Sequence, residues 1–126
     1  MQEKDMVVRV LFGDDKPEIR EDLTKALREC KLKVDLASTP QEVIAKARAG
    51  NYLAVITDLN YTRDGNEGYD VLRELRDNSS CKILYTAKMG FEFAAEGLEK
   101  GADYVILRKD KSQLIELVTK LAGEIK

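Results

Sequence analysis

The stretch LAVITD, residues 53–58, decides the fold, because it is a short apolar run that ends abruptly in a carboxylate. Val55 and Ile56 are β-branched, and the run does not alternate between apolar and polar residues. Such a run predicts a strand that is covered on both faces, as the strands of parallel sheets are. Asp58 then lies at the carboxyl end of a buried strand, where open α/β sheets place their ligands.

The length and composition predict one globular domain over residues 1–126. A chain of 126 residues can bury roughly two thirds of its unfolded surface, so it forms a core without a second domain. Hydrophobic residues make up 44% of the chain and charged residues 35%, with a formal net charge of -2. This balance gives no broad attraction to nucleic acid or to anionic membranes, so we expect neither as a direct partner.

The two cysteines predict reduced thiols rather than a disulfide. Cys30 falls on the apolar face of a predicted helix, and Cys81 lies next to a predicted strand. Because no signal-like segment opens the chain, this usage favours the cytoplasm. The sequence has no histidine and no CxxC motif, so an ordinary zinc site would lack ligands.

Strand patterns alternate with helical patterns along the whole chain. Strands are expected at residues 7–12, 33–37, 53–58, 82–86 and 104–107, and apolar stripes at helical spacing cover residues 19–30, 43–47, 71–75, 93–98 and 114–122. Five strands that alternate with five helices predict an α/β fold, in which helices cover both faces of a parallel sheet.

Several helix ends are marked by residues that cap helices. Thr39, Pro40 and Glu42 form the pattern of a capping box with proline at the first helical position. We expect Ser112 to cap the last helix and Gly123 to end it.

Polar residues collect where the predicted strands end. They are Asp14 and Asp15 after the first strand, Asp58 after the third, Thr86 after the fourth, and Arg108 and Lys109 after the fifth. Three carboxylates at one edge repel one another unless a cation joins them, and an oxygen-only ligand set suits Mg²⁺. A carboxylate beside Mg²⁺, a lysine and a threonine hydroxyl is arranged to attack phosphorus and hold an aspartyl phosphate.

At these residues the chain resembles the receiver domain of bacterial-type response regulators over nearly its whole length. The pair Thr86-Ala87 and the segment LRKDKS, residues 107–112, also look like the corresponding segments of that family. The resemblance implies a three-layer (βα)5 flavodoxin-like sandwich with a five-stranded parallel sheet in the order 2-1-3-4-5. It also implies a role in two-component signalling.

The resemblance further implies a role for each of these residues. Asp58 would accept a phosphoryl group from a histidine kinase or a phosphotransfer protein. Mg²⁺ would be bound by Asp14, Asp15 and Asp58 with the main-chain carbonyl of Asn60. Thr86 and Lys109 would contact the phosphoryl oxygens. We expect a phospho-acceptor switch, not an enzyme in the usual sense, with Mg²⁺-dependent self-phosphorylation and autodephosphorylation.

Three features depart from the family pattern. The loop after Asp58 lacks the usual proline and reaches Gly68 about two residues late, which indicates an unusual partner at this surface. The lysine after the fifth strand arrives one residue later than is common in the family, so either the strand holds a bulge or Arg108 takes its place. We favour Lys109 because of its Lys-Asp-x-Ser context. Ile106 stands where many relatives have an aromatic switch residue, so we expect Tyr104, or a displacement of residues 88–97, to report switching.

The sequence leaves several functions to be compared. The favoured one is a stand-alone receiver that presents a changed surface to a downstream protein, because no effector domain follows Lys126. The alternative is a degenerate receiver that acts as a phosphorylation-independent interaction module. A Mg²⁺-dependent phosphohydrolase is disfavoured, since Asn60 stands where such an enzyme would need a second aspartate. Taken singly, Asp14 and Asp15 also fit a helix cap, and Asp58 fits a turn.

Overall fold

The computed structural model describes residues 8–63, 65–88 and 90–124, and within them five parallel strands form one sheet. The strands are β1 (Arg9–Gly13), β2 (Lys33–Ala37), β3 (Ala54–Thr57), β4 (Cys81–Thr86) and β5 (Tyr104–Leu107). They lie side by side in the order β2-β1-β3-β4-β5. This order confirms the flavodoxin-like arrangement that the sequence predicts.

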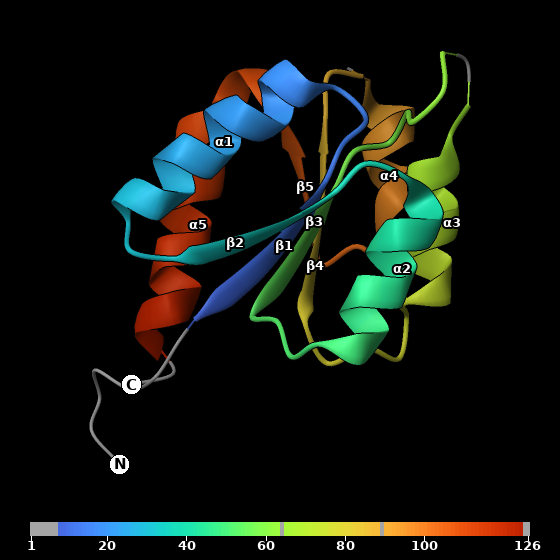
Figure 1. The fold of residues 1–126 in the computed structure, drawn as a ribbon. Coiled ribbons are helices and arrows are strands. Elements are labelled where there is room, and N and C mark those ends of the chain that lie inside the picture. Colours follow the sequence, from blue (N-terminus) through green and yellow to red (C-terminus); the bar gives the residue numbers. More distant parts are fainter. Residues whose placement is uncertain (1–7, 64, 89, 125–126) are drawn as a thin grey trace.

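Helices cover both faces of the sheet. They are α1 (Pro17–Glu29), α2 (Pro40–Ala49), α3 (Glu67–Glu74), α4 (Phe91–Lys100) and α5 (Lys111–Glu124), and a short 3-10 helix, η2 (Arg108–Asp110), precedes the last of them. Figure 1 shows α1 and α5 on one face of the sheet and α2, α3 and α4 on the other. The predicted three-layer α/β sandwich is therefore confirmed.

The central strands are buried on both faces, as the run at residues 53–58 predicts. In β3, Ala54 and Ile56 pack in the cluster that includes residues of α1 and α5, whereas Val55 packs on the opposite side with residues of α2 and α3. None of these three side chains is more than 1% exposed. Alternate residues of one strand thus serve two cores, which explains why the run shows no polar face.

The predicted start of α2 is confirmed by its cap. Thr39 is the N-cap residue, and its Oγ1 accepts a hydrogen bond of 3.1 Å from the main-chain N–H of Glu42. Glu42 reaches back one residue further than expected, because its Oε1 accepts the N–H of Ser38 at 2.7 Å. These bonds satisfy N–H groups that the first helical turn leaves free.

Two expectations about the ends of α5 are wrong. Because η2 follows β5 directly, α5 begins at Lys111, and Ser112 lies inside its first turn instead of at the N-cap. Gly123 lies inside the helix, which ends at Glu124.

Val7, expected in the first strand, is outside the described residues.

The cysteines are free and half-buried, and both pack against the cluster on the α1 and α5 side. Within residues 8–63, 65–88 and 90–124, none of the helices combines the length and apolar character needed to cross a membrane.

Candidate metal centre

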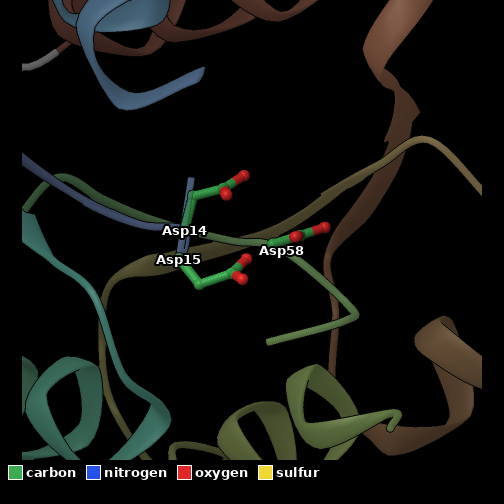
Figure 2. A group of neighbouring side chains, drawn as sticks. All are labelled: Asp14, Asp15 and Asp58. Carbon is green, nitrogen blue, oxygen red and sulfur yellow. The ribbon is translucent and has the colours of Figure 1, made fainter. Parts of the chain in front are cut away.

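Three aspartates meet at the carboxyl edge of the sheet because β1 and β3 are neighbours. Gly13 and Thr57 are partners in the parallel register, so Asp14 and Asp15 leave β1 at the level at which Asp58 leaves β3. One carboxylate oxygen from each of the three lies within 4.8 Å of the others. Figure 2 shows the three side chains extending toward the same side from these two strand ends. The strand order β2-β1-β3-β4-β5 has its topological switch point between β1 and β3, and open α/β sheets bind ligands at such a point.

Asp14 is fully buried and held from several directions. Its Oδ1 accepts the main-chain N–H of Lys16 at 2.9 Å, and its Oδ2 accepts Nη2 of Arg108 at 3.1 Å. Its own carbonyl accepts Nη1 of Arg20 at 2.6 Å. Burial raises the pKa of Asp14, although the hydrogen bond from Lys16 and the charge of Arg108 act in the opposite direction. The side chain is thus fixed in place.

Asp58 is 2% exposed, and its carboxylate is the most strongly perturbed of the three. Its Oδ1 accepts the N–H of Leu59 at 2.8 Å and lies 3.2 Å from Nη2 of Arg108. Burial, followed by the negative charge of Asp14, raises the pKa of Asp58 to about 6, with Arg108 opposing the shift. A cation bound at this edge would favour the ionised form.

Asp15 has a buried oxygen that accepts no hydrogen bond from the described residues. This atom is Oδ1, and the nearest cation of its ion pairs, Nζ of Lys16, is 3.5 Å away. A buried carboxylate oxygen without a partner is costly, and a hard divalent ion would remove that cost. The three aspartates, which offer only oxygen atoms, therefore suit Mg²⁺.

Arg108, not Lys109, reaches the acidic cluster. β5 ends at Leu107, which pairs with Thr86, so the next side chain is the one placed at the strand edge. Arg108 extends from that position to Asp14 and Asp58, with 21% of its side chain exposed. Lys109 follows on η2, is exposed, and forms no ion pair with the described residues. The structure thus does not bring Lys109 to the place for which its sequence context favoured it.

Thr86 ends β4 and lies 1% exposed at the same edge of the sheet. Its Oγ1 accepts the N–H of Lys88 at 3.1 Å, which fixes the start of the following loop. Tyr85, one residue earlier, is also buried, and its hydroxyl donates to the carbonyl of Arg108 at 3.3 Å. The Tyr85 hydroxyl therefore links β4 to the residue that follows β5, at the edge of the sheet that carries the three aspartates.

The loop between β3 and α3 is held by contacts that the sequence analysis did not find. Tyr61 is buried and shares a hydrogen bond of 2.8 Å with Oγ1 of Thr57. One oxygen of Glu67 accepts the N–H groups of Tyr61 and Thr62, at 3.1 and 3.3 Å, and the other accepts the Thr62 hydroxyl. Although burial raises it, these hydrogen bonds lower the pKa of Glu67 overall. The only sequence signal for this clamp is an acidic residue in the first turn of α3.

Asn60 lies inside this loop, between Asp58 and the clamp. Its side-chain Nδ2 donates to Oδ1 of Asn66 at 3.1 Å and to the carbonyl of Gly65. The side chain thus stabilises the loop, and the main-chain carbonyl of Asn60 is the group expected to bind the metal.

The chain belongs to the response regulator receiver domain family. The family model matches residues 10–119, which include β1 from Val10 onward, the other four strands and all the residues described at the cluster. No curated protein gives a significant sequence match.

Solved structures of receiver domains superimpose over most of the chain. The receiver domain of Francisella response regulator 1452 is 22% identical, with 94% of this chain and 99% of that one covered and a TM-score of 0.83. Response regulator protein TrrA from Thermotoga maritima, solved in complex with Mg²⁺-BeF, is 30% identical, with coverage of 91% and 99% and a TM-score of 0.78. A CheY-like receiver domain protein from Methanospirillum hungatei is 21% identical, with coverage of 94% and 99% and a TM-score of 0.77.

Membership in this family defines the general role of the protein. Receiver domains of two-component systems are phosphorylated on an aspartate and act as switches, not as enzymes in the usual sense. They interact with kinases or phosphotransfer proteins and with downstream targets. The resemblance inferred from the strand-end residues is thereby confirmed.

Proposed function

We propose that this receiver accepts a phosphoryl group on Asp58 from a histidine kinase or a phosphotransfer protein and then presents a changed surface to a downstream protein. The observation that carries the proposal is the convergence of three carboxylates within 4.8 Å, with Asp58 almost completely buried. In the transfer, an oxygen of the Asp58 carboxylate attacks phosphorus, an acyl phosphate forms, and the bond to the donor nitrogen breaks with the electron pair leaving on the donor.

Asp14, Asp15 and Asp58 would hold Mg²⁺ together with the main-chain carbonyl of Asn60. The buried Oδ1 of Asp15, which has no hydrogen-bond partner in the described part of the chain, and the all-oxygen donor set support this assignment. That TrrA was solved with Mg²⁺-BeF supports the same metal here. When bound, Mg²⁺ supplies positive charge for the phosphoryl oxygens and lowers repulsion among the carboxylates.

Thr86 and a cation from the end of β5 would contact the phosphoryl oxygens. For the cation, the sequence context favours Lys109, whereas the geometry favours Arg108, whose Nη2 lies 3.2 Å from Asp58. We assign the role to Arg108 and keep Lys109 as the alternative. Because Thr86 ends β4 and Arg108 follows the neighbouring strand β5, contacts with a new phosphoryl group would move that edge of the sheet.

Treatment with acetyl phosphate and Mg²⁺, followed by intact-mass measurement of the wild type and Asp58→Asn, tests the proposal. A stable gain of one phosphoryl group in the wild type alone supports the switch. No adduct supports the degenerate interaction module instead. Rapid hydrolysis of varied phosphoesters would favour a phosphohydrolase, which Asn60 makes the least expected result because it offers no carboxylate two residues after Asp58.

A further inference from the structure

A groove runs along α1 beside β2, which is an outer strand of the sheet, and Figure 1 shows these two elements next to each other. Its volume is about 720 Å³, within the range of about 300–1,000 Å³ that is typical of small-molecule sites. Its lining includes Pro17, Arg20, Thr24, Lys25 and Arg28 of α1 and Leu36 of β2. Among the described residues, none of the three aspartates of the candidate metal centre belongs to this lining, so the groove is a separate feature.

Thr24 brings a buried hydroxyl to the groove. The residue is 6% exposed, and its Oγ1 has no hydrogen-bond partner within residues 8–63, 65–88 and 90–124. Thr119 of α5 donates to the carbonyl of Ile115 at 2.7 Å, as helical threonines often do, whereas Thr24 makes no such bond within α1. A buried hydroxyl without a partner costs free energy. A ligand atom bound in the groove is positioned to remove that cost.

Three cations of the groove form no ion pair in the described part of the chain: Arg20, Lys25 and Arg28. Other helices of the protein do pair their charges along one face. Glu42 and Lys46 of α2, and Glu96 and Lys100 of α4, are each 3.2 Å apart. The cations of the groove therefore remain available to a bound anion.

Positive charge is in excess in the groove. Two carboxylates, those of Glu21 and Glu29, accompany the three cations, so the lining carries one net positive charge in a chain whose formal net charge is -2. Arg20 uses Nη1 to donate to the carbonyl of Asp14 at 2.6 Å. Because a guanidinium has five N–H donors, Arg20 keeps others for a ligand.

We propose that this groove binds a small organic anion that has an acidic head and an apolar body. The cations and the Thr24 hydroxyl would hold the head, since charge-assisted hydrogen bonds are roughly twice as strong as neutral ones. Pro17 and Leu36, with the aliphatic stems of the arginine and lysine side chains, would contact the body. The excess of positive charge favours an anion over a neutral molecule of the same shape.

NMR titration of the whole chain with three probes tests this ligand class. Hexanoate has both the acidic head and the apolar body, acetate has only the head, and hexan-1-ol has only the body. We expect saturable amide shifts at residues 17–29 and 33–37 with hexanoate, and binding about tenfold weaker or more with each of the other two. No saturable response to hexanoate, or an equal response to hexan-1-ol, overturns the proposal.

Substitutions at Thr24 test the role of its hydroxyl. Thr24→Val keeps the shape of the side chain but removes the hydroxyl, so hexanoate should bind about tenfold more weakly, whereas Thr24→Ser should stay within about twofold of the wild type. Without ligand, Thr24→Val should be at least as stable to urea as the wild type, because no protein hydrogen bond is lost. A clear loss of stability in Thr24→Val, or unchanged hexanoate binding by it, overturns the proposal.

Matched lysine substitutions test the role of the charge. Lys25→Gln removes a cation of the groove, and Lys120→Gln removes an exposed lysine of α5 that is outside the lining. We expect Lys25→Gln to weaken hexanoate binding about threefold and Lys120→Gln to leave it unchanged. Amide spectra of each variant establish that the fold is retained. Equal effects of the two substitutions show attraction by overall charge only and overturn the proposal.

Discussion

Gly68 packs directly on the main chain of Asp58. A Cβ placed on Gly68 would overlap the carbonyl oxygen of Asp58 and lie 2.6 Å from the Cα of Leu59. The N–H of Gly68 also donates to the carbonyl of Leu59 at 2.8 Å. The start of α3 is thus held against the end of β3, and the longer loop between them returns to Asp58 in spite of its additional residues.

Replacement of Gly68 by alanine should therefore destabilise the protein. We expect Gly68→Ala to lower the free energy of unfolding by about 1–3 kcal/mol, since the added methyl meets main-chain atoms that have little freedom to move. Gly123→Ala is the matched control, because no atom of the described residues lies within 4 Å of a Cβ there and alanine favours the helix. Urea unfolding of both variants checks this, and a Gly68→Ala variant as stable as Gly123→Ala would contradict the packing.

The raised pKa of Asp58 makes the stability of the metal-free protein depend on pH. Since the pKa is about 6 in the folded protein against an ordinary value of 3.8, the folded chain keeps a proton that the unfolded chain has lost between these pH values. Stability contributed by the protonated form is complete below pH 3.8 and is lost as the pH rises to 6, by roughly 2–3 kcal/mol in total. Relative to the wild type, Asp58→Asn should therefore gain stability from pH 4 to pH 7 in EDTA.

The control for this pH dependence is Asp70→Asn, because the Asp70 side chain is 64% exposed on α3. Its unfolding curve should parallel that of the wild type at every pH. Mg²⁺ should reduce the difference between wild type and Asp58→Asn, since a bound cation favours the ionised carboxylate. Parallel curves for Asp58→Asn and wild type in EDTA would show that the carboxyl titrates normally.

Asp15 should contribute more to metal binding than to the stability of the fold. Asp15→Ala removes a carboxylate whose buried Oδ1 has no hydrogen bond within residues 8–63, 65–88 and 90–124, so we expect little loss of stability in EDTA. The same substitution should abolish most of the rise in melting temperature that Mg²⁺ produces in the wild type, because one oxygen ligand is lost. Thermal melts in EDTA and in millimolar Mg²⁺ measure both effects, and a full metal response in Asp15→Ala would exclude this residue as a ligand.

For Asp14 we expect a substitution to lower the stability of the metal-free protein, because its carboxylate is paired. Oδ1 accepts the N–H of Lys16 and Oδ2 accepts Arg108, so Asp14→Ala leaves the N–H of Lys16 without this acceptor and leaves Arg108 with Asp58 alone. This variant should lose about 1–3 kcal/mol in EDTA, which Asp15→Ala should not. Equal losses for the two variants would show that the unpartnered oxygen of Asp15 has a protein partner in solution.

The Glu67 clamp should control the order of the loop that contains Asn60. Glu67→Ala removes the acceptor for the N–H groups of Tyr61 and Thr62, so amide hydrogen exchange at both positions should accelerate. Mg²⁺ affinity should fall with it, since the Asn60 carbonyl is no longer held. Asp70→Ala, on the same helix, is the control. Unchanged exchange in Glu67→Ala would show that Tyr61 alone anchors the loop.

Thr86 should couple phosphorylation to the movement of β4 and β5. Thr86→Ala should still accept a phosphoryl group on Asp58 but show smaller amide chemical-shift changes in both strands, and Thr86→Ser should restore them because it keeps the hydroxyl. Tyr104, which is 44% exposed on β5, remains the aromatic residue expected to report the change. A wild-type shift pattern in Thr86→Ala would mean that the signal leaves through residues 60–68 instead.

The fold was predictable because its signals are local. An apolar run without alternation, such as residues 53–58, predicts a buried parallel strand in a chain that alternates strands and helices. Apolar residues at spacings of three and four mark the helices between the strands. Ser112 and Gly123 were misplaced because a 3-10 turn after β5 shifts the start of α5, and cap residues mark helix ends only to within a residue or two.

The acidic part of the site was predictable for a geometric reason, whereas its surroundings were not. The carboxyl ends of parallel strands share one edge, so Asp14, Asp15 and Asp58 had to meet once β1 and β3 were neighbours. The choice between Arg108 and Lys109 depends on the last residue of β5, and a shift of one residue turns a side chain to the other side.

The pair formed by Asp14 and Arg108 also bears on how the chain is made. These residues are 94 positions apart, so all three aspartates leave the ribosome long before the guanidinium that pairs with two of them. A nascent chain with only its first three strands must carry this repulsion at the sheet edge without relief from Arg108. Arg108 offsets part of the negative charge of this edge only when the fifth strand has joined, so the acidic edge reaches its final charge late in synthesis.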